Sequence, residues 1–399
     1  MLCELLYPHG SGSELATYLY AELLKKAGIN VTIVTNRFTG EPEVSRKNNL
    51  MIYRLPLLSK KSVKYSTLRR LDILTSSFMR KLIKQADIVY IPRYWFSAIP
   101  LAKALRKPVI VHLHDYISIC PLALLYDSRR YGICRKGKFC SAGCIYAYES
   151  VKKNLFRTTS SVFLNLTVWR ILKCFIECAD AIICVSNTHR DLLVKHAPSV
   201  SKKIHVIYNP LPSLPFTEIN GDGFGYFGGP SYARGFHVLL RALHHRRAKK
   251  LKLVNVYATK FINNKHYDAD LFDKFRFILY GKLRYRELDE IYRKIKAVII
   301  PSTFAETFSY VAAESLLRGR LIIASNIGGM LELMEGCKGV FLFDTGNAVQ
   351  LAEKIDYING LSISDVFDLC LSNRERFRKR FSNEKTLQKF LDLCNKIAT

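Results

Sequence analysis

The sequence predicts an α/β protein made of two Rossmann-like, doubly wound domains that face each other across a cleft. Three observations predict this class: short β-branched runs alternate with helical segments, the alternation restarts after a stretch rich in proline and glycine, and 399 residues suit two domains. We expect a first domain over residues 1–208, a linker over 209–222, a second domain over 223–375, and a C-terminal helix over 376–399 that packs back on the first domain.

The first half opens with a strand, a glycine-rich turn, a helix and a second strand, which is the repeating unit of a parallel sheet. The first strand covers Met1–Leu6, the helix covers Leu15–Ala27 with Gly28 after its last turn, and the second strand covers Asn30–Thr35. The stretch Val162–Val185 predicts an amphipathic helix followed by a strand, because charged residues interrupt it. Other short apolar runs predict strands at Ala86–Ile91, Pro108–His114, Ala181–Ser186 and Lys203–Tyr208.

The second half repeats the alternation of strands and helices. Strands are expected at Phe224–Phe227, Lys252–Ala258, Arg276–Leu279, Ala297–Ile300, Leu321–Ala324 and Gly339–Leu342. Helices are expected at Gly235–Arg246, Arg286–Lys294 and Tyr310–Leu317. Ligands of such sheets bind beyond the carboxyl ends of the strands, so the motifs in the loops that follow the strands are the candidates for a site.

The composition limits the class of protein and of partner. The formal charge of +28 comes from 61 Lys and Arg against 33 Asp and Glu, and it requires an anionic partner: phosphate, nucleic acid or an acidic membrane leaflet. An aromatic content of 12% excludes a disordered chain. The 11 cysteines are an odd number in a long chain, which argues against a secreted scaffold held by disulfides. Neither a signal peptide nor an apolar stretch of ~18 residues is evident. We expect a cytoplasmic protein whose contact with the inner face of the cell membrane, if any, is peripheral.

Two motifs in the first half follow predicted strands. The glycines of Gly10-Ser-Gly12-Ser-Glu14 would let the backbone approach a phosphate or a sugar at a helix N-terminus, and a plain tight turn is the alternative. His112 and His114 lie on one face of a strand at its end, where a side chain can touch a substrate. A structural histidine is the alternative there.

The second half offers one cation and two carboxylates. Arg234, in the glycine-rich stretch Gly228–Gly235 before a helix, can pair with a diphosphate or can be a solvated surface residue. Glu306 precedes a helix that contains Glu314, so the two carboxylates lie ~80° apart around its axis and ~12 Å apart along it. Backbone N–H groups at the start of this helix could hold phosphate; they belong to Phe308, Ser309 and Tyr310.

Together these motifs resemble the family 4 glycosyltransferases, which are retaining enzymes of the two-domain GT-B fold. Glu306 and Glu314 are similar to the E-x7-E motif of that family, Gly10 to Glu14 to its first glycine-rich loop, and His114-Asp115 to its HD turn. The resemblance covers nearly the whole chain. Other segments that are similar to those of the family are Ala179–Ser186, Lys203–Pro210 and Gly328–Glu332.

The resemblance implies retaining transfer of a hexosyl-type group from a nucleotide-diphosphate sugar to a glycan or polyprenyl-linked acceptor, with no cofactor and no catalytic metal. It implies that His114 and Glu306 contact the donor sugar as catalytic residues, that Glu314 binds the ribose and that Arg234 binds the diphosphate. The leaving diphosphate is the expected base for the acceptor proton. Backbone groups implied to approach the phosphates or the anomeric carbon are those of Gly10, Gly12, Phe308, Ser309 and Tyr310.

Three positions depart from the family pattern. Gly229 stands where the family often has an arginine, so one of two phosphate-binding cations is missing. Ser309 stands where the family often has a glycine. The first strand is several residues shorter than usual, as a truncated or misassigned start would make it.

Two further features leave alternatives open. Cys120, Cys134, Cys140 and Cys144 could form a structural zinc site, or could be free thiols or a disulfide. Residues 51–110 hold 13 Lys and Arg against two acidic residues. Leu68–Lys84 is expected to be a basic amphipathic helix that, with Ser59–Lys64, docks on a membrane carrying the acceptor, or else a solvated basic face.

The rival functions are a sugar-nucleotide epimerase of the same fold and a basic protein that binds nucleic acid or membranes without catalysis. We expect no nucleic-acid partner, because the sequence has no zinc-finger spacing, basic zipper or RNP-like aromatic motif.

Overall fold

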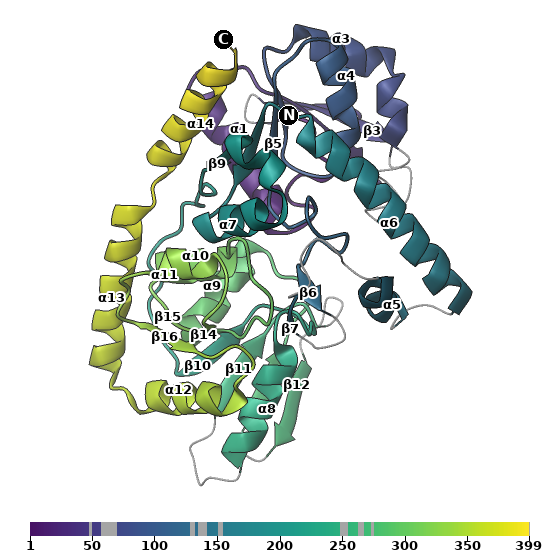
Figure 1. Cartoon of the computed structure of the whole chain (residues 1–399). Helices are drawn as coiled ribbons and strands as arrows, with labels where there is room; N and C mark the ends of the chain where they lie inside the picture. The colour runs from purple at the N-terminus through teal and green to yellow at the C-terminus, as the bar shows by residue number, and fades with distance from the viewer. Residues whose placement is uncertain are drawn as a thin grey trace. The chain divides into compact units, whose positions relative to one another are not determined.

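The computed structural model describes residues 1–47, 50–56, 70–127, 132–134, 142–150, 155–247, 254–261, 267–272 and 275–398 (Figure 1). The chain divides into two compact units. The first consists of Met1–Arg129, Cys134–Leu211 and Ser382–Thr399, and the second of Arg130–Ile133 and Pro212–Phe381. The division at Leu211 and Pro212 falls within the stretch predicted as a linker. Both units are α/β, as the sequence predicts.

The first unit is built on parallel strands. One sheet has the order β4 (Val89–Ile91), β5 (Val109–Leu113), β8 (Ala181–Cys184) and β9 (Ile204–Val206), with every neighbour parallel. A second sheet has β1 (Thr32–Arg37) parallel to β3 (Leu50–Pro56), which pairs antiparallel with β2 (Val44–Lys47). The short strand β6 covers Tyr126–Asp127. A further short strand, β7, covers Gly132–Ile133, in a segment that belongs to the second unit.

The first predicted strand, Met1–Leu6, is wrong in its length. Only isolated bridges form there, between Leu2 and Val34 and between Cys3 and Arg93. They join the two sheets, because the Leu2 N–H donates to the Tyr90 carbonyl at 2.9 Å and the Cys3 N–H donates to the Val34 carbonyl at 3.0 Å. Past Cys3, the Asn36 N–H still donates to the Glu4 carbonyl at 3.4 Å, but no strand continues to Leu6.

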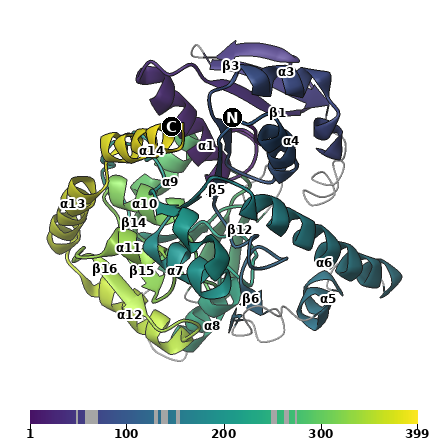
Figure 2. The same cartoon turned by 45° about the horizontal axis from the view of Figure 1, so that its top comes forward.

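The first unit also contains α-helices. They are α1 (Gly12–Lys26), α3 (Ser77–Gln85), α4 (Ala98–Ala104), α5 (Ala142–Ser150), α6 (Leu155–Glu177), α7 (Asn187–His196) and α14 (Asn383–Ala398), with 3-10 turns at Arg70–Leu74, Trp95–Ser97 and Pro198–Lys203. Helix α14 lies beside α1 in both views (Figure 2). Its Phe390 and Leu393 share a buried core with Tyr20 of α1, Ile110 of β5 and Ile183 of β8.

Two predicted helices differ from the structure. The segment 376–399 is not one helix, because α13 ends at Arg380 and α14 begins at Asn383, whose side chain exchanges hydrogen bonds of 2.7 and 2.9 Å with the backbone of Leu211. Leu68–Lys84 is not one helix either. The Ser76 hydroxyl accepts the Met79 N–H and starts α3, after a separate 3-10 turn. Ser59–Lys64 lies outside the described residues.

The second unit has one seven-stranded sheet with the order β12-β13-β11-β10-β14-β15-β16. The strands are β10 (Gly223–Tyr226), β11 (Val254–Ala258), β12 (Tyr267–Phe272), β13 (Phe275–Leu279), β14 (Ile295–Ile300), β15 (Leu321–Ser325) and β16 (Val340–Phe343). All neighbours are parallel except the edge pair of β12 and β13. The helices are α8 (Phe236–Arg247), α9 (Tyr285–Lys294), α10 (Tyr310–Leu317), α11 (Met330–Met334), α12 (Ala348–Gly360) and α13 (Ile363–Arg380).

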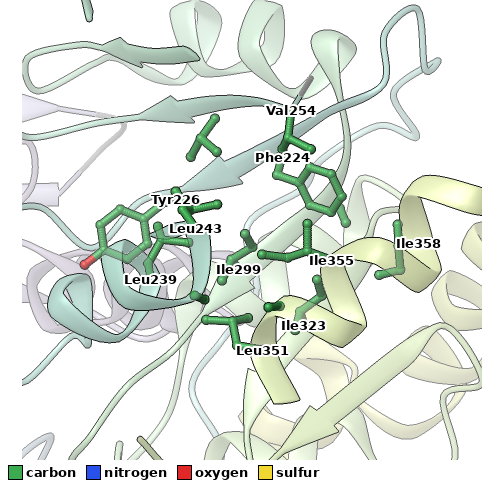
Figure 3. Packing of buried hydrophobic residues seen from close by; sticks show 14 of the residues in the cluster. Phe224, Tyr226, Leu239, Leu243, Val254, Ile299, Ile323, Leu351, Ile355 and Ile358 are labelled. Carbon is green, nitrogen blue, oxygen red and sulfur yellow. The ribbon is translucent and has the colours of Figure 1, made fainter. Parts of the chain in front are cut away.

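The core of the second unit follows the alternation of its strands. Figure 3 shows Ile299 and Ile323, from neighbouring strands, against Ile355 of α12, with Leu239 of α8 close by. Val298 and Ile300, the neighbours of Ile299 in β14, point to the opposite face and are also buried, so both faces of the strand are covered. A sheet buried on both faces leaves the loops at the ends of its strands as the places for polar function.

Candidate functional site

Arg234 and Glu306 form the centre of the candidate site in the second unit. The Arg234 Nη1 lies 2.6 Å from the Glu306 Oε1, and the Ser302 hydroxyl donates to the same oxygen. Glu306 is 2% exposed, whereas the Arg234 side chain is 43% exposed and lies over the ring of Phe304. The charge of Glu306 raises the pKa of Arg234. A buried carboxylate thus holds a cation whose outer side faces solvent.

The loop that carries Arg234 is fixed by neighbours on both sides. The Tyr226 hydroxyl donates to the Gly229 carbonyl at 2.9 Å, and the Thr303 N–H donates to the Ala233 carbonyl at 2.9 Å. Gly235 has φ +75°, and a Cβ on it would lie 1.6 Å from the Pro301 carbonyl oxygen. Only glycine therefore allows the start of α8 to approach the end of β14, and this approach brings Arg234 to Glu306.

The backbone of Glu306 is held by the loop after β15. The Gly329 N–H donates to the Glu306 carbonyl at 2.6 Å. Gly328 has φ +77°, and a Cβ on it would lie 2.6 Å from the Glu306 nitrogen. Strands β11, β10, β14 and β15 are parallel, so the loops that meet here all follow carboxyl ends at one edge of the sheet. This is the edge at which ligands of such sheets bind.

Glu314 is held by an arginine that the sequence reasoning missed. Arg318 is fully buried and its Nη1 lies 3.8 Å from the Glu314 Oε2. The same guanidinium bonds Asp289 at 2.7 Å and stacks on the ring of Tyr292. The spacing of four residues from Glu314 was the available signal, because i and i+4 side chains meet on a helix.

The start of α10 is where the sequence places it. Ser309 is the N-cap, and its side chain accepts the Ala312 N–H at 3.4 Å. Its φ of −129° is ordinary extended backbone, so this position does not need the glycine that the family often has. The rings of Phe308 and Tyr310 meet edge to face at 5.2 Å. Phe308, Ser309 and Tyr310 thus lie at the N-terminal end of α10.

Lys260 is a second cation at this edge, and the sequence analysis did not identify it. It follows β11, and its N–H donates to the Gly281 carbonyl at 3.1 Å. Burial lowers the pKa of Lys260, as do the charges of Arg234 and Lys282, while Glu314 and Glu306 oppose them. Its ammonium therefore lies in the field of the residues described above. Its short loop matched no motif, and only its place after a strand next to β10 could have indicated it.

The first unit seats a carboxylate in its glycine-rich loop. Glu14 is 2% exposed, accepts the Ser11 N–H at 2.6 Å, and pairs with Arg93 at 2.5 Å. Gly10 has φ +89°, and a Cβ on it would lie 2.5 Å from the Glu14 side chain. Gly12 is the first residue of α1. Gly10 thus makes room for Glu14, and Arg93 is a further residue that the sequence did not indicate.

The two histidines lie at the end of β5, also in the first unit. The rings of His112 and His114 stack at 4.3 Å, which confirms that they share a face. The His112 Nδ1 shares a hydrogen bond of 2.6 Å with the Tyr90 hydroxyl. Burial, with the neighbouring His112 and Arg93, lowers the pKa of His114 well below its ordinary value. His114 is therefore neutral at physiological pH and can exchange hydrogen bonds with a hydroxyl.

The cysteines of the expected zinc site are only partly covered by the structure. Cys120, Cys134 and Cys144 form no disulfide with another described residue, and Cys140 lies outside the described residues. In the part of the chain that the structure describes, no group of three His, Cys, Asp or Glu side chains is arranged to hold a metal. Within the same residues, every helix is too short or too polar to cross a bilayer.

Two family models match this chain. The model described as Glycosyltransferase Family 4 matches residues 10–212, and the model described as Glycosyl transferases group 1 matches residues 222–359. An uncharacterised 42.6 kDa protein in the cps region of Klebsiella pneumoniae is 22% identical over 355 residues, 85% of this chain and 88% of that protein. An uncharacterised glycosyltransferase of Methanocaldococcus jannaschii is 26% identical over 218 residues, 52% of this chain and 57% of that protein.

Solved structures share the fold over the whole chain. One is Anabaena HepE in complex with UDP and glucose, with a TM-score of 0.67 at 14% identity, covering 99% of this chain and 98% of that one. Another is the sucrose-phosphate synthase of Thermosynechococcus elongatus, with a TM-score of 0.67 at 15% identity and the same coverage. At such identities the likeness establishes the fold alone.

Proposed function

We propose that this chain, which belongs to glycosyltransferase family 4, transfers a hexosyl-type group from a nucleotide-diphosphate sugar to an acceptor hydroxyl with retention of configuration. The observation that carries the proposal is the pair of Arg234 and Glu306, 2.6 Å apart at the carboxyl edge of the second sheet, with Glu314 in the helix that follows. A neighbour of the same fold was solved with UDP and glucose, which supports a donor of this class.

On the donor side, each group has a role suited to its chemistry. Glu306 is acceptor-only when ionised, so it would bind sugar hydroxyls, and Glu314 would bind the hydroxyls of the ribose. The exposed side of Arg234 would bind the diphosphate with paired N–H groups, and the N-terminus of α10 at Phe308 to Tyr310 would add backbone donors. No cofactor is needed for these roles.

In the first unit, we assign His114 to a hydroxyl of the donor sugar and the backbone at Gly10 and Gly12 to its phosphates or anomeric carbon. A neutral imidazole can donate or accept such a hydrogen bond without competing with the arginine for the phosphate. The leaving diphosphate would take the proton of the acceptor hydroxyl on the face where that hydroxyl attacks. Rate acceleration would then come from alignment and from stabilising the departing charge.

The proposed reaction is tested with a panel of nucleotide-diphosphate sugars. The purified chain is first screened for a rise in melting temperature, because a ligand that binds only the folded state stabilises it. The donor selected in this way is then incubated with glycan and polyprenyl-phosphate acceptors, and NMR of the product gives the anomeric configuration. An inverted product would contradict the retaining mechanism. Conversion of the donor to its epimer without transfer would favour an epimerase instead.

The acceptor class is proposed from the basic surface of the first unit. Helix α3 packs Met79 and Ile83 into the protein, so its apolar face is not available to a bilayer. It exposes Arg80, Lys81 and Lys84, whose charges would attract an anionic lipid surface. We propose a lipid-linked acceptor reached by peripheral docking through this face.

Reversal of the three basic residues of α3 to glutamate tests the docking. Each basic residue near the surface contributes about 1 kcal/mol, so we expect binding to phosphatidylglycerol vesicles at low salt to fall by roughly 10²-fold. Co-sedimentation measures it, and Lys338→Glu in the second unit is the control. Equal binding of the triple variant and the wild type would contradict docking through α3.

A further inference from the structure

We propose that Lys260 is a donor-binding residue that supplies, with Arg234, the positive charge for the diphosphate, in the space that Gly229 leaves open. The inference rests on the proposed nucleotide-diphosphate donor and names the second residue that holds its charge.

The loops after β10 and β11 are packed against each other at this point. The Thr259 N–H donates to the Tyr226 carbonyl at 3.1 Å, and the Tyr226 hydroxyl donates to Gly229. A Cβ built on Gly229 would lie 3.3 Å from the Lys260 Cβ and 3.4 Å from the Lys260 carbonyl oxygen. A side chain at 229 would therefore begin beside the start of the lysine stem. Glycine at 229 leaves this space to Lys260.

The backbone of Lys260 is held in a conformation that a lysine rarely adopts. Its φ is +71°, in the left-handed region that favours glycine. The loop is fixed there by two hydrogen bonds of 3.1 Å, from the Lys260 N–H to Gly281 and from the Phe261 N–H to Tyr280. Strained backbone of this kind persists when its surroundings determine it, and it is concentrated at functional sites.

Binding a diphosphate at this edge of the sheet calls for a cation in addition to Arg234 and Arg318, because both arginines are paired with carboxylates. Arg234 is paired with Glu306, and Arg318 is shared between Glu314 and Asp289. These groups comprise two cations and three carboxylates, and a diphosphate would add further negative charge. Among the described residues, no ion pair within 4.0 Å is recorded for Lys260. Because the Lys260 stem begins beside Gly229, in the loop that carries Arg234, a diphosphate bound at Arg234 would also lie in the field of the Lys260 charge.

Binding of UDP, GDP and ADP, measured by isothermal titration calorimetry, tests the role of Lys260. With the diphosphate that binds the wild type best, we expect Lys260→Met to weaken binding at least tenfold and Lys260→Arg to stay within threefold. Lys338→Met is the matched control, because Lys338 precedes β16 and so lies at the opposite edge of the parallel sheet. It should bind as the wild type does.

A charge exchange sharpens the test. Gly229 and Lys260 both have positive φ, at +67° and +71°, so Gly229→Lys with Lys260→Gly keeps one lysine and one glycine in left-handed positions. We expect the exchange to restore binding to within threefold of the wild type, with circular dichroism to verify folding. If the doubly substituted protein does not fold, the affinity of Lys260→Arg tests whether the charge at this position binds the diphosphate.

The outcomes separate this inference from the proposed function. Wild-type affinity in Lys260→Met, or equal weakening in Lys260→Met and Lys260→Arg, would overturn the role of the lysine and leave the proposed function standing. A wild type that binds none of the three diphosphates and none of the nucleotide sugars would overturn both.

Discussion

The glycine-rich loop of the first unit and that of the second unit use the same device for different ends. Each loop takes part in a pair of an arginine and a buried carboxylate. In the first unit the loop carries Glu14, which Arg93 of another loop pairs with at 2.5 Å. In the second unit the loop carries Arg234, which pairs at 2.6 Å with Glu306 of another loop. Glu14, however, also caps its own helix, since it accepts the Ser11 N–H at 2.6 Å. The carboxylate of Glu14 is therefore already hydrogen-bonded to other residues of the protein.

The second loop leaves more of its charge available. The Arg234 side chain is 43% exposed against 28% for Arg93, and Lys260 lies near Arg234 as a further cation. Glu306 lies before its helix and does not cap it, because Ser309 does so. We therefore propose that the arginine–carboxylate pair stabilises the fold in the first unit and binds the donor in the second. Substitutions that affect folding or activity selectively can test this distinction.

The largest expected effect is on activity, in Glu306→Gln. Loss of the charge removes the best acceptor for sugar hydroxyls, so transfer should fall on the order of 10²-fold. Stability should change by less than about 1 kcal/mol, because Arg234 can turn towards solvent. Initial rates and thermal melts measure the two quantities.

Glu335→Gln is the matched control for this variant. Glu335 pairs with Arg380 at the same 2.6 Å distance but is 71% exposed, so neither rate nor stability should change much. Full activity in Glu306→Gln would remove Glu306 from the site and with it the contrast between the two loops.

The next effect is on stability, in Glu14→Gln. The amide keeps the shape but weakens the cap and leaves Arg93 without its charged partner, so unfolding should become easier by about 2 kcal/mol. Urea unfolding measures this, with Glu43→Gln as the control, since Glu43 pairs with Arg37 on the surface. A variant with unchanged stability but activity as low as that of Glu306→Gln would show that the Glu14 side chain acts on the ligand and not on the fold.

The sequence predicts the helices and strands better than it predicts which side chains pair with each other in the site. Helix α10 has the predicted bounds, and the shared face of His112 and His114 follows from simple alternation. Each depends on local periodicity, which a sequence contains. The prediction of the first strand is wrong in its length, because its pairing depends on residues of other strands that are far away in the sequence. The prediction of one basic helix over Leu68–Lys84 is wrong because Ser76 caps a new helix in the middle of the amphipathic pattern.

The partners within the site could not be predicted from local pattern. Arg93 and Glu14 are 79 residues apart, and the loop of Arg234 is bonded to Thr303 across 70 residues. Only the sheet order brings such loops together at one edge. The glycines give a partial signal, because Gly235 and Gly328 stand where a Cβ would collide with another loop, but a sequence does not say with which.

At pH 7 the smallest expected effect comes from the histidines beside Arg93, and it grows as the pH falls. Burial lowers the pKa of His112 to about 3 and that of His114 well below its ordinary value. The unfolded chain therefore binds more protons below about pH 6.5, and stability falls as the pH decreases from 7 towards 4. Each histidine should contribute roughly 1 kcal/mol per pH unit in that range.

Replacing either histidine by glutamine should make the slope of stability against pH shallower by that amount. The slope is measured by urea unfolding at several pH values, and the difference from the wild type cancels other groups such as Asp115, whose pKa burial raises. His244→Gln, on the exposed side of α8, is the control variant. Unaltered slopes in both His112→Gln and His114→Gln would mean that the two histidines take up protons at the same pH in the folded and the unfolded chain. His114 would then be charged below about pH 6.5, and its charge would attract the phosphate that we assign to Arg234.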